Sequence, residues 1–160
     1  MPLGAQVVTH GKYPKSAIVI FNKHLTITKI VQVSDEWTIC VEVKSKSENY
    51  YVVSSYFQHR FNIAPFLNRI KDICALLGRE KLIIMADTNA KSAMWYSKIN
   101  DAKGEALLNL IMEEDLIIAN QPGNPPTFRN TQGGESNIDI TLMSQKLNNH
   151  TYNWIVEDGL

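Results

Sequence analysis

Apolar and polar residues alternate through most of the first half of the chain, which is the pattern of half-buried β-strands. Residues 17–21 form a short apolar run, and residues 25–33, 37–43 and 50–56 alternate or are rich in Val and Tyr. Short polar stretches separate these segments. Strands joined by short turns commonly pair as antiparallel neighbours, so the pattern predicts a strand-rich half built from adjacent hairpins.

The pattern then changes to a helical period. Apolar residues recur at spacings of three and four, namely Ile63, Phe66, Leu67, Ile70, Ile73, Cys74 and Leu77. This spacing forms one face of an α-helix. Asn62 can cap the start of the helix, Pro65 is tolerated in its first turn, and Gly78 suits its end. A second helix with inward-facing leucines is predicted over residues 101–115.

Strands alternate with these helices in the second half. Residues 81–86 are apolar on both faces, which is typical of a central strand. Further strands are predicted at residues 116–119, 127–129, 137–143 and 153–157, and Gly133 with Gly134 predicts a hairpin turn between the middle two. Strands covered by helices indicate a layered α/β domain with mixed sheets. A length of 160 residues fits a single domain, residues 1–160.

Charge and composition limit the functions that fit. Sixteen basic and sixteen acidic residues give a formal net charge of zero, whereas strong non-specific DNA binders usually carry a basic excess. Tight, sequence-blind DNA binding is therefore not predicted. No apolar run is long enough to span a membrane, and residues 1–15 lack the apolar centre of a secretory signal. Cys40 and Cys74 fall at apolar positions and are interpreted as small buried residues in a reducing compartment.

Asp87 and Asn89 follow the most apolar strand directly. Catalytic groups often lie beyond the carboxyl ends of such strands, and residues two apart in an extended segment point to the same side. One of the two could activate a water molecule while the other donates to a phosphate oxygen. The alternative is an ordinary turn, because Asp and Asn favour turns by bonding to nearby backbone groups.

Two further strands carry candidate residues. Asp139 is flanked by isoleucines and needs a partner if its face is buried, unless the isoleucines face the core and Asp139 faces water. Tyr56 ends its strand, where its hydroxyl could contact a phosphate or simply pack half-buried. His59 and Arg60 follow and could add donors or positive charge. Trp95 could stack on a base, although core packing is the simpler interpretation.

Four segments in order carry a family resemblance. Residues 82–95 combine a strand with Asp-x-Asn-Ala and Ser-x-x-Trp, residues 104–110 form the helix that follows, residues 126–128 are Pro-Thr-Phe, and residues 134–142 contain Ser-x-Ile-Asp-x-Thr. Together they resemble the endonuclease/exonuclease/phosphatase superfamily. Within it, they are most similar to the endonuclease domain of insect-type non-LTR retrotransposons. The resemblance covers essentially the whole chain.

The resemblance implies a four-layered α/β sandwich that uses Mg²⁺ or Mn²⁺, and no small-molecule cofactor, to hydrolyse phosphodiester bonds of DNA. Asp87 would activate the attacking water, Asn89 would hold the scissile phosphate, and Tyr56 would contact it. Asp139 would orient a catalytic histidine near the C-terminus. The implied location is intracellular, in the nucleus.

The chain also departs from the family pattern. A strand bearing Asn, a helix and a strand ending in Gln-Glu are expected first, but nothing before Ala17 resembles them. A Ser-Asp-His motif is expected beyond Val156, yet the sequence stops at Leu160. We therefore expect an incomplete fold without the principal metal-binding Glu and the Asp-His pair. The alternatives to a DNA endonuclease are a non-catalytic remnant and a phosphatase of the same superfamily.

Overall fold

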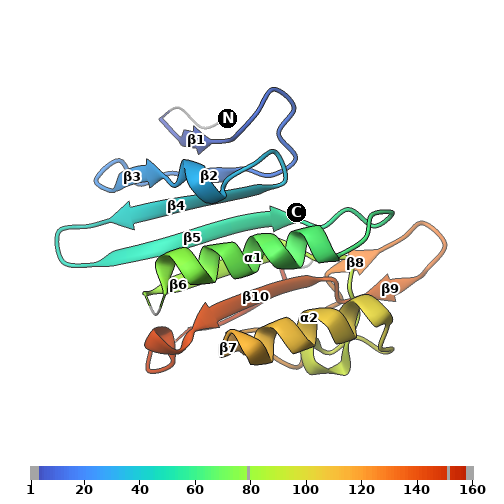
Figure 1. The fold of residues 1–160 in the computed structure, drawn as a ribbon. Coiled ribbons are helices and arrows are strands. Elements are labelled where there is room, and N and C mark those ends of the chain that lie inside the picture. The colour runs from blue at the N-terminus through green and yellow to red at the C-terminus, as the bar shows by residue number, and fades with distance from the viewer. Residues whose placement is uncertain (1–3, 79, 151, 158–160) are drawn as a thin grey trace.

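A computed structural model describes residues 4–78, 80–150 and 152–157 of the chain. Its main element is a six-stranded sheet with the strand order β3-β4-β5-β6-β10-β7 (Figure 1). The strands are β3 (Thr26–Lys29), β4 (Thr38–Lys44), β5 (Asn49–Tyr56), β6 (Leu82–Asp87), β10 (Asp139–Ser144) and β7 (Leu116–Ile118). Only β5 and β6 are parallel in this sheet, and the other neighbours are antiparallel.

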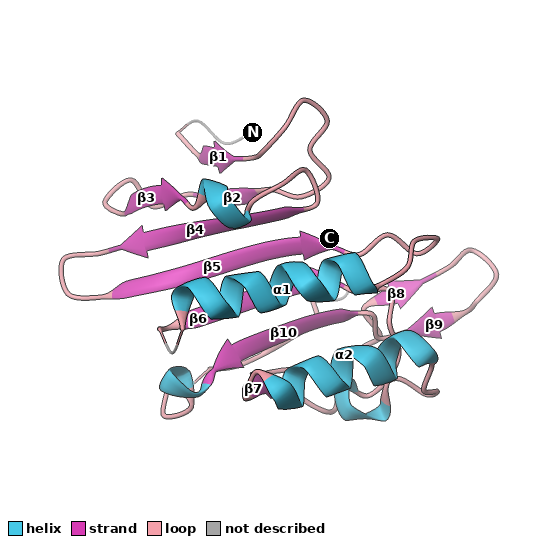
Figure 2. Cartoon of the chain, in the orientation of Figure 1, coloured by secondary structure: helices cyan, strands magenta, loops and turns pink. Residues whose placement is uncertain are grey.

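Two helices, α1 (Ala64–Leu77) and α2 (Ala102–Glu113), cover one face of the sheet (Figure 2). The face that they cover is apolar because alternate residues of the central strands, such as Val53, Ile84 and Ile140, point toward them. The same cluster holds the inner sides of both helices, including Ile70 and Leu107. This layer contains the largest buried core of the described residues.

The connection through α1 explains why β5 and β6 are parallel, because a parallel pair needs a crossover between its strands. The side chain of Asn62 accepts a hydrogen bond from the amide of Ala64 (2.9 Å), but Ile63, not the predicted Asn62, is the capping residue directly before the helix. Pro65 lies in the first turn. Gly78 ends the helix with φ 59°, a conformation that a residue with a Cβ adopts only with strain.

The other face of the sheet is covered at its two sides. A ribbon of β1 (Gln6–Val8) and β2 (Ile18–Ile20) packs Ile18 against Ile39 and Val41 of β4. On the opposite side, Leu147 and Trp154 pack with Met143 of β10. The middle of this face stays open, where Met85 of β6 is 44% exposed.

Most of the predicted elements are present, but two predicted pairings were wrong and two predicted strands are shortened or irregular. The segment 17–21 does not pair with 25–33, because β2 pairs with β1, a strand that the sequence pattern did not reveal. The segment 25–33 also ends its strand at Lys29 and turns into a 3-10 helix, Val31–Val33. Ser34 follows this 3-10 helix and stabilises it, because its hydroxyl donates to Ile30 O (2.8 Å).

The predicted hairpin around Gly133 and Gly134 pairs differently. Its strands are β8 (Phe128–Arg129) and β9 (Glu135–Ser136), whereas β10 leaves the hairpin to lie between β6 and β7. The predicted strand at residues 153–157 is irregular. The side chain of Asn124 takes over its backbone pairing, since it accepts from Val156 N (2.8 Å) and donates to Trp154 O (3.3 Å).

None of the described helices is both long and apolar enough to cross a membrane.

Candidate active site

Three of the four predicted site residues lie in one row across the central strands. Asp87 is the last residue of β6, and its register partners are Tyr56 at the end of β5 and Asp139 at the start of β10. The three side chains line one cavity of about 490 Å³ on the open face of the sheet. Period-2 alternation produces this arrangement, because it turns Asp87 to the face opposite Ala86.

The surroundings of the two carboxyl groups disfavour their ionised forms. Burial raises the pKa of Asp87 above its ordinary value, and the nearby charge of Asp139 raises it further, against a small opposing effect of the Asn89 amide. Burial also raises the pKa of Asp139, and a hydrogen bond with the Thr127 side chain partly offsets this rise. Among the described residues, no cation forms a salt bridge with either carboxylate, although Lys15 lines the same cavity.

The fourth predicted residue, Asn89, adopts a different orientation. It has φ 47°, and its side-chain Nδ2 donates to Phe57 O (2.9 Å) while its backbone amide donates to Asp87 Oδ1 (3.3 Å). These bonds tie the exit of β6 to the exit of β5. The left-handed backbone and the bond to Asp87 are features of the turn that was the alternative interpretation.

A polar network that the sequence reasoning missed holds the backbone of Asp139. The Thr127 hydroxyl oxygen accepts from the amides of Ile138 (3.0 Å) and Asp139 (3.1 Å). Asn120 donates from Nδ2 to Asp139 O (3.0 Å) and accepts at Oδ1 from Thr141 N (2.9 Å). Thr127 belongs to the Pro-Thr-Phe segment, whereas Asn120 resembles an ordinary residue after a strand and gives no local signal.

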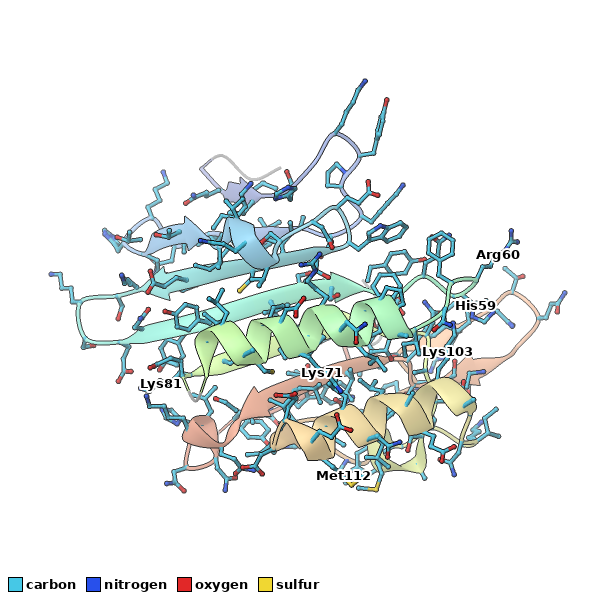
Figure 3. The ribbon with its side chains drawn as sticks, viewed as in Figure 1. His59, Arg60, Lys71, Lys81, Lys103 and Met112 are labelled. Atoms are coloured by element: carbon cyan, nitrogen blue, oxygen red, sulfur yellow. The ribbon has the colours of Figure 1, made fainter. Side chains whose placement is uncertain are left out.

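The remaining residues that the sequence singled out differ in their exposure to solvent. Trp95 is 0% exposed and donates from Nε1 to Ala90 O (3.2 Å), so it packs in the core and cannot stack on a base. His59 and Arg60 are exposed, and they gather with Lys103 where α1 and α2 begin (Figure 3). Burial raises the thiol pKa of Cys40 to about 12 and dominates the rise of Cys74 to about 12, which removes both as nucleophiles.

A metal ion would find hard oxygen donors in this cavity. Asp87 and Asp139 are adjacent carboxylates without a cationic partner among the described residues, and a divalent cation there would favour their ionised forms. Mg²⁺ is commonly held by one or two carboxylates, with waters and substrate phosphate completing its shell. The described residues contain no group of three or more acids, histidines or cysteines that could hold a metal. The two carboxylates could therefore hold Mg²⁺ only with substrate or water as further ligands.

The mixed sheet with two helices on one face matches the fold of solved endonuclease/exonuclease/phosphatase structures. The endonuclease domain of TRAS1, a telomere-specific non-LTR retrotransposon, superposes with a TM-score of 0.84 and 28% identity, over 90% of this chain and 68% of that chain. Residues 50–159 match the model of the endonuclease-reverse transcriptase family. The chain belongs to this family.

Two curated relatives are retrotransposon proteins. The Pol polyprotein of the type-1 element R1 of Bradysia coprophila is 31% identical over 150 residues, which is 89% of this chain. A putative 115 kDa protein of element R1DM of Drosophila melanogaster is 25% identical over 167 residues, covering 99% of this chain. The chain spans only 15% and 16% of the length of these two relatives.

Proposed function

We propose that this chain contributes to a Mg²⁺-dependent site that hydrolyses phosphodiester bonds of DNA and nicks a strand. Support comes from the family, whose description names an endonuclease, and from the TRAS1 domain, which is named as one. Chromosomal DNA as substrate would make the nucleus the place of action. The fold alone does not choose this substrate, because one fold hosts many chemistries and the site has to carry the argument.

The observation that carries the proposal is the pairing of Asp87 with Asp139 across β6 and β10. Two like charges in a half-buried cavity destabilise a fold, so their presence is more typical of a functional site than of a structural one. Tyr56 lines the same cavity and brings a hydroxyl donor. Lys15 adds a positive charge that a phosphate could meet.

Each residue then has a role that its position allows. The ionised carboxylate of Asp87 accepts a proton from a water held in the cavity, and its raised pKa brings it closer to that of a useful base. The Tyr56 hydroxyl donates to a phosphate oxygen. Asn89 braces the strand ends through its side chain, which donates to Phe57 O.

Mg²⁺ held by the carboxylate of Asp139 would stabilise the negative charge that develops on the phosphate, while the carboxylate of Asp87 stays available as the base. Further ligands of this ion would come from substrate and water.

A plasmid-nicking assay tests the proposal. Supercoiled plasmid is incubated with the purified chain and Mg²⁺, and the nicked circular form is quantified on agarose gels over time. We expect Asp87→Ala to lower the nicking rate by roughly 100-fold or more, which is the usual contribution of a general base. Asp72→Ala is the matched control, because Asp72 is an exposed aspartate on α1.

Two results would contradict the proposal. Equal nicking by the unaltered chain and Asp87→Ala would assign the activity to another site or a contaminant. Absence of nicking by the unaltered chain, with the fold intact by circular dichroism, would leave a non-catalytic domain of the same family.

A further inference from the structure

A second cavity, of about 520 Å³, lies between the start of β4 and the start of α1. Its lining joins aromatic rings to charged side chains, principally Asp35, Trp37, Arg60, Phe61, Phe66 and Arg69. The volume falls within the range of roughly 300–1,000 Å³ that small-ligand sites occupy. None of the roles given to the Asp87 cavity uses these side chains.

The aromatic wall connects this cavity to the candidate active site. The Trp37 ring lies 5.7 Å from Phe61 at 66° and 6.0 Å from Phe66 at 79°, which are edge-to-face contacts. The same ring lies 5.9 Å from the ring of Tyr56, which lines the Asp87 cavity. A ligand on Phe61 would therefore be separated from the phosphate at Tyr56 by one ring.

Phe61 itself is the exposed part of this wall. Its side chain is 50% exposed, although a phenylalanine gains free energy when its ring is buried. An exposed aromatic ring at the edge of a groove is a stacking platform for a nucleobase, because every base presents a π-face.

The charge of the cavity favours an anion. Its acid, Asp35, is already used: Oδ1 accepts from Trp37 N (2.8 Å) and Thr38 N (2.9 Å), and Oδ2 lies 3.0 Å from Arg69 Nη2. Arg60 forms no ion pair with any described residue. Figure 3 shows Arg60 at the end of the molecule where both helices begin, with His59 and Lys103 nearby. A phosphate next to a stacked base would meet the positive charge of Arg60.

We propose that this cavity binds one unpaired nucleotide of DNA, next to the phosphodiester bond at Tyr56. The base stacks on Phe61 within the cavity, and the phosphate pairs with Arg60. The nucleotide is unpaired because a base within a duplex has its faces covered by its neighbours. This inference deepens the proposed nuclease function and rests on it for the choice of DNA.

Binding is measured apart from catalysis. A 5′-labelled single strand of about ten nucleotides, a length within the usual range of site sizes, is titrated with the chain in EDTA, and fluorescence anisotropy gives Kd. We expect Phe61→Ala and Arg60→Ala each to weaken binding by roughly 5- to 10-fold, the lower end of measured stacking and phosphate contributions. Phe61→Trp should restore binding, because it keeps a stacking surface.

Matched controls separate the cavity from general surface effects. Phe21→Ala removes a ring that is 65% exposed at the end of β2, and Lys46→Ala removes a charge in the turn between β4 and β5, at the other end of the sheet. Both should bind the strand with unchanged Kd. A strand of abasic sugar-phosphate units should be insensitive to Phe61→Ala but should still bind less tightly to Arg60→Ala.

The inference is overturned if the unaltered chain binds no strand, if Phe61→Ala binds with unchanged Kd, or if Phe61→Ala weakens the abasic strand equally. Asp87→Ala identifies which proposal has failed. Phe61-dependent binding without any nicking would keep the nucleotide cavity and reject the nuclease. Nicking that depends on Asp87 but not on Phe61 or Arg60 would keep the nuclease and reject the nucleotide cavity.

Discussion

At the scale of single residues, the two aspartates of the candidate active site lower the stability of the fold. Asp87 and Asp139 are half-buried, adjacent and without a cationic partner in the described part of the chain, so each ionised form is less favourable in the folded state than in water. The cost is larger for Asp87, which has the charge of its neighbour added to its own burial. The backbone around Asp139 is nevertheless fully bonded, through Thr127 and Asn120. A fold that keeps two such charges in place keeps them for a purpose other than its own stability.

Asp87→Asn is therefore expected to stabilise the chain while it abolishes nicking. Asn keeps the oxygen that accepts from the Asn89 amide but removes the charge. A gain of about 1 kcal/mol at neutral pH would raise Tm by about 2–4 °C in a chain of this size. Thermal unfolding followed by circular dichroism measures this change. Asp72→Asn on the exposed side of α1 serves as control and should leave Tm within about 1 °C.

The raised pKa values also make the stability of the folded chain depend on pH. Both aspartates have a folded-state pKa above the ordinary value of 3.8, so the folded state holds their protons more tightly than the unfolded state. Their contribution to stability is complete below pH 3.8 and is lost as pH rises through the raised values. Asp87→Asn should flatten this dependence above pH 3.8. A variant that is less stable than the unaltered chain at pH 7 would contradict this electrostatic account.

At the scale of elements, the start of α2 is fastened to the loop that follows Asp87. The Asp101 carboxylate caps the helix by accepting from Gly104 N (2.7 Å) and also accepts from Lys91 N (3.1 Å). The Asp101 amide donates in return to Lys91 O (3.0 Å). Because Lys91 lies four residues after Asp87, this junction transmits the position of the helix to the active-site loop.

Gly104→Ala should break that junction. A Cβ at position 104 would overlap the carbonyl oxygen of Lys91, which is backbone and cannot rotate away. The clash should cost about 1–3 kcal/mol and exceed the gain of about 1 kcal/mol in helix propensity. Urea unfolding measures the net loss. Asn109→Ala, an exposed position of the same helix, should be neutral or slightly stabilising, and equal effects of the two substitutions would contradict the proposed contact.

At the scale of the whole molecule, the layers that cover the two faces of the sheet differ in how extensively they are packed. The helical face closes one large core, whereas the ribbon of β1 and β2 has three residue pairs and rests on the sheet through Ile18 and a hydrogen bond from Ser16 to Ser54 O (2.8 Å). A two-stranded ribbon is marginally stable unless packing supports it. Local opening should therefore begin at the ribbon.

Native-state hydrogen exchange followed by mass spectrometry tests this order of opening. We expect amides of β1 and β2 to exchange roughly 100-fold faster than those of β5 and β6, as low-stability units do. Strand β3 is the useful comparison, because it is also an edge but belongs to the large sheet. Exchange of the ribbon at the rate of β5 would mean that it opens only when the whole domain unfolds.

The sequence alone determined the elements whose burial is regular. Strand β6, helix α1 and strands β4 and β5 are predicted because one face of each is continuously apolar, and that periodicity is local. The ribbon strand β1 is too short to show a period, and Val31 and Val33 flank the polar Gln32 in a 3-10 helix as they would in a strand. The placement of Asp87 at a strand end was equally a local prediction.

Only the tertiary structure decided which of these ends meet. The alternation around Asp139 permits either an exposed or an inward carboxylate, and the register of β10 against β6 puts it opposite Asp87. The contact of Trp37 with Tyr56 and Phe61 likewise joins residues from different elements. A pattern along the chain records which face of an element is buried. Which residue lies opposite depends on pairing between segments far apart in sequence, and only folding of the whole sheet fixes that pairing.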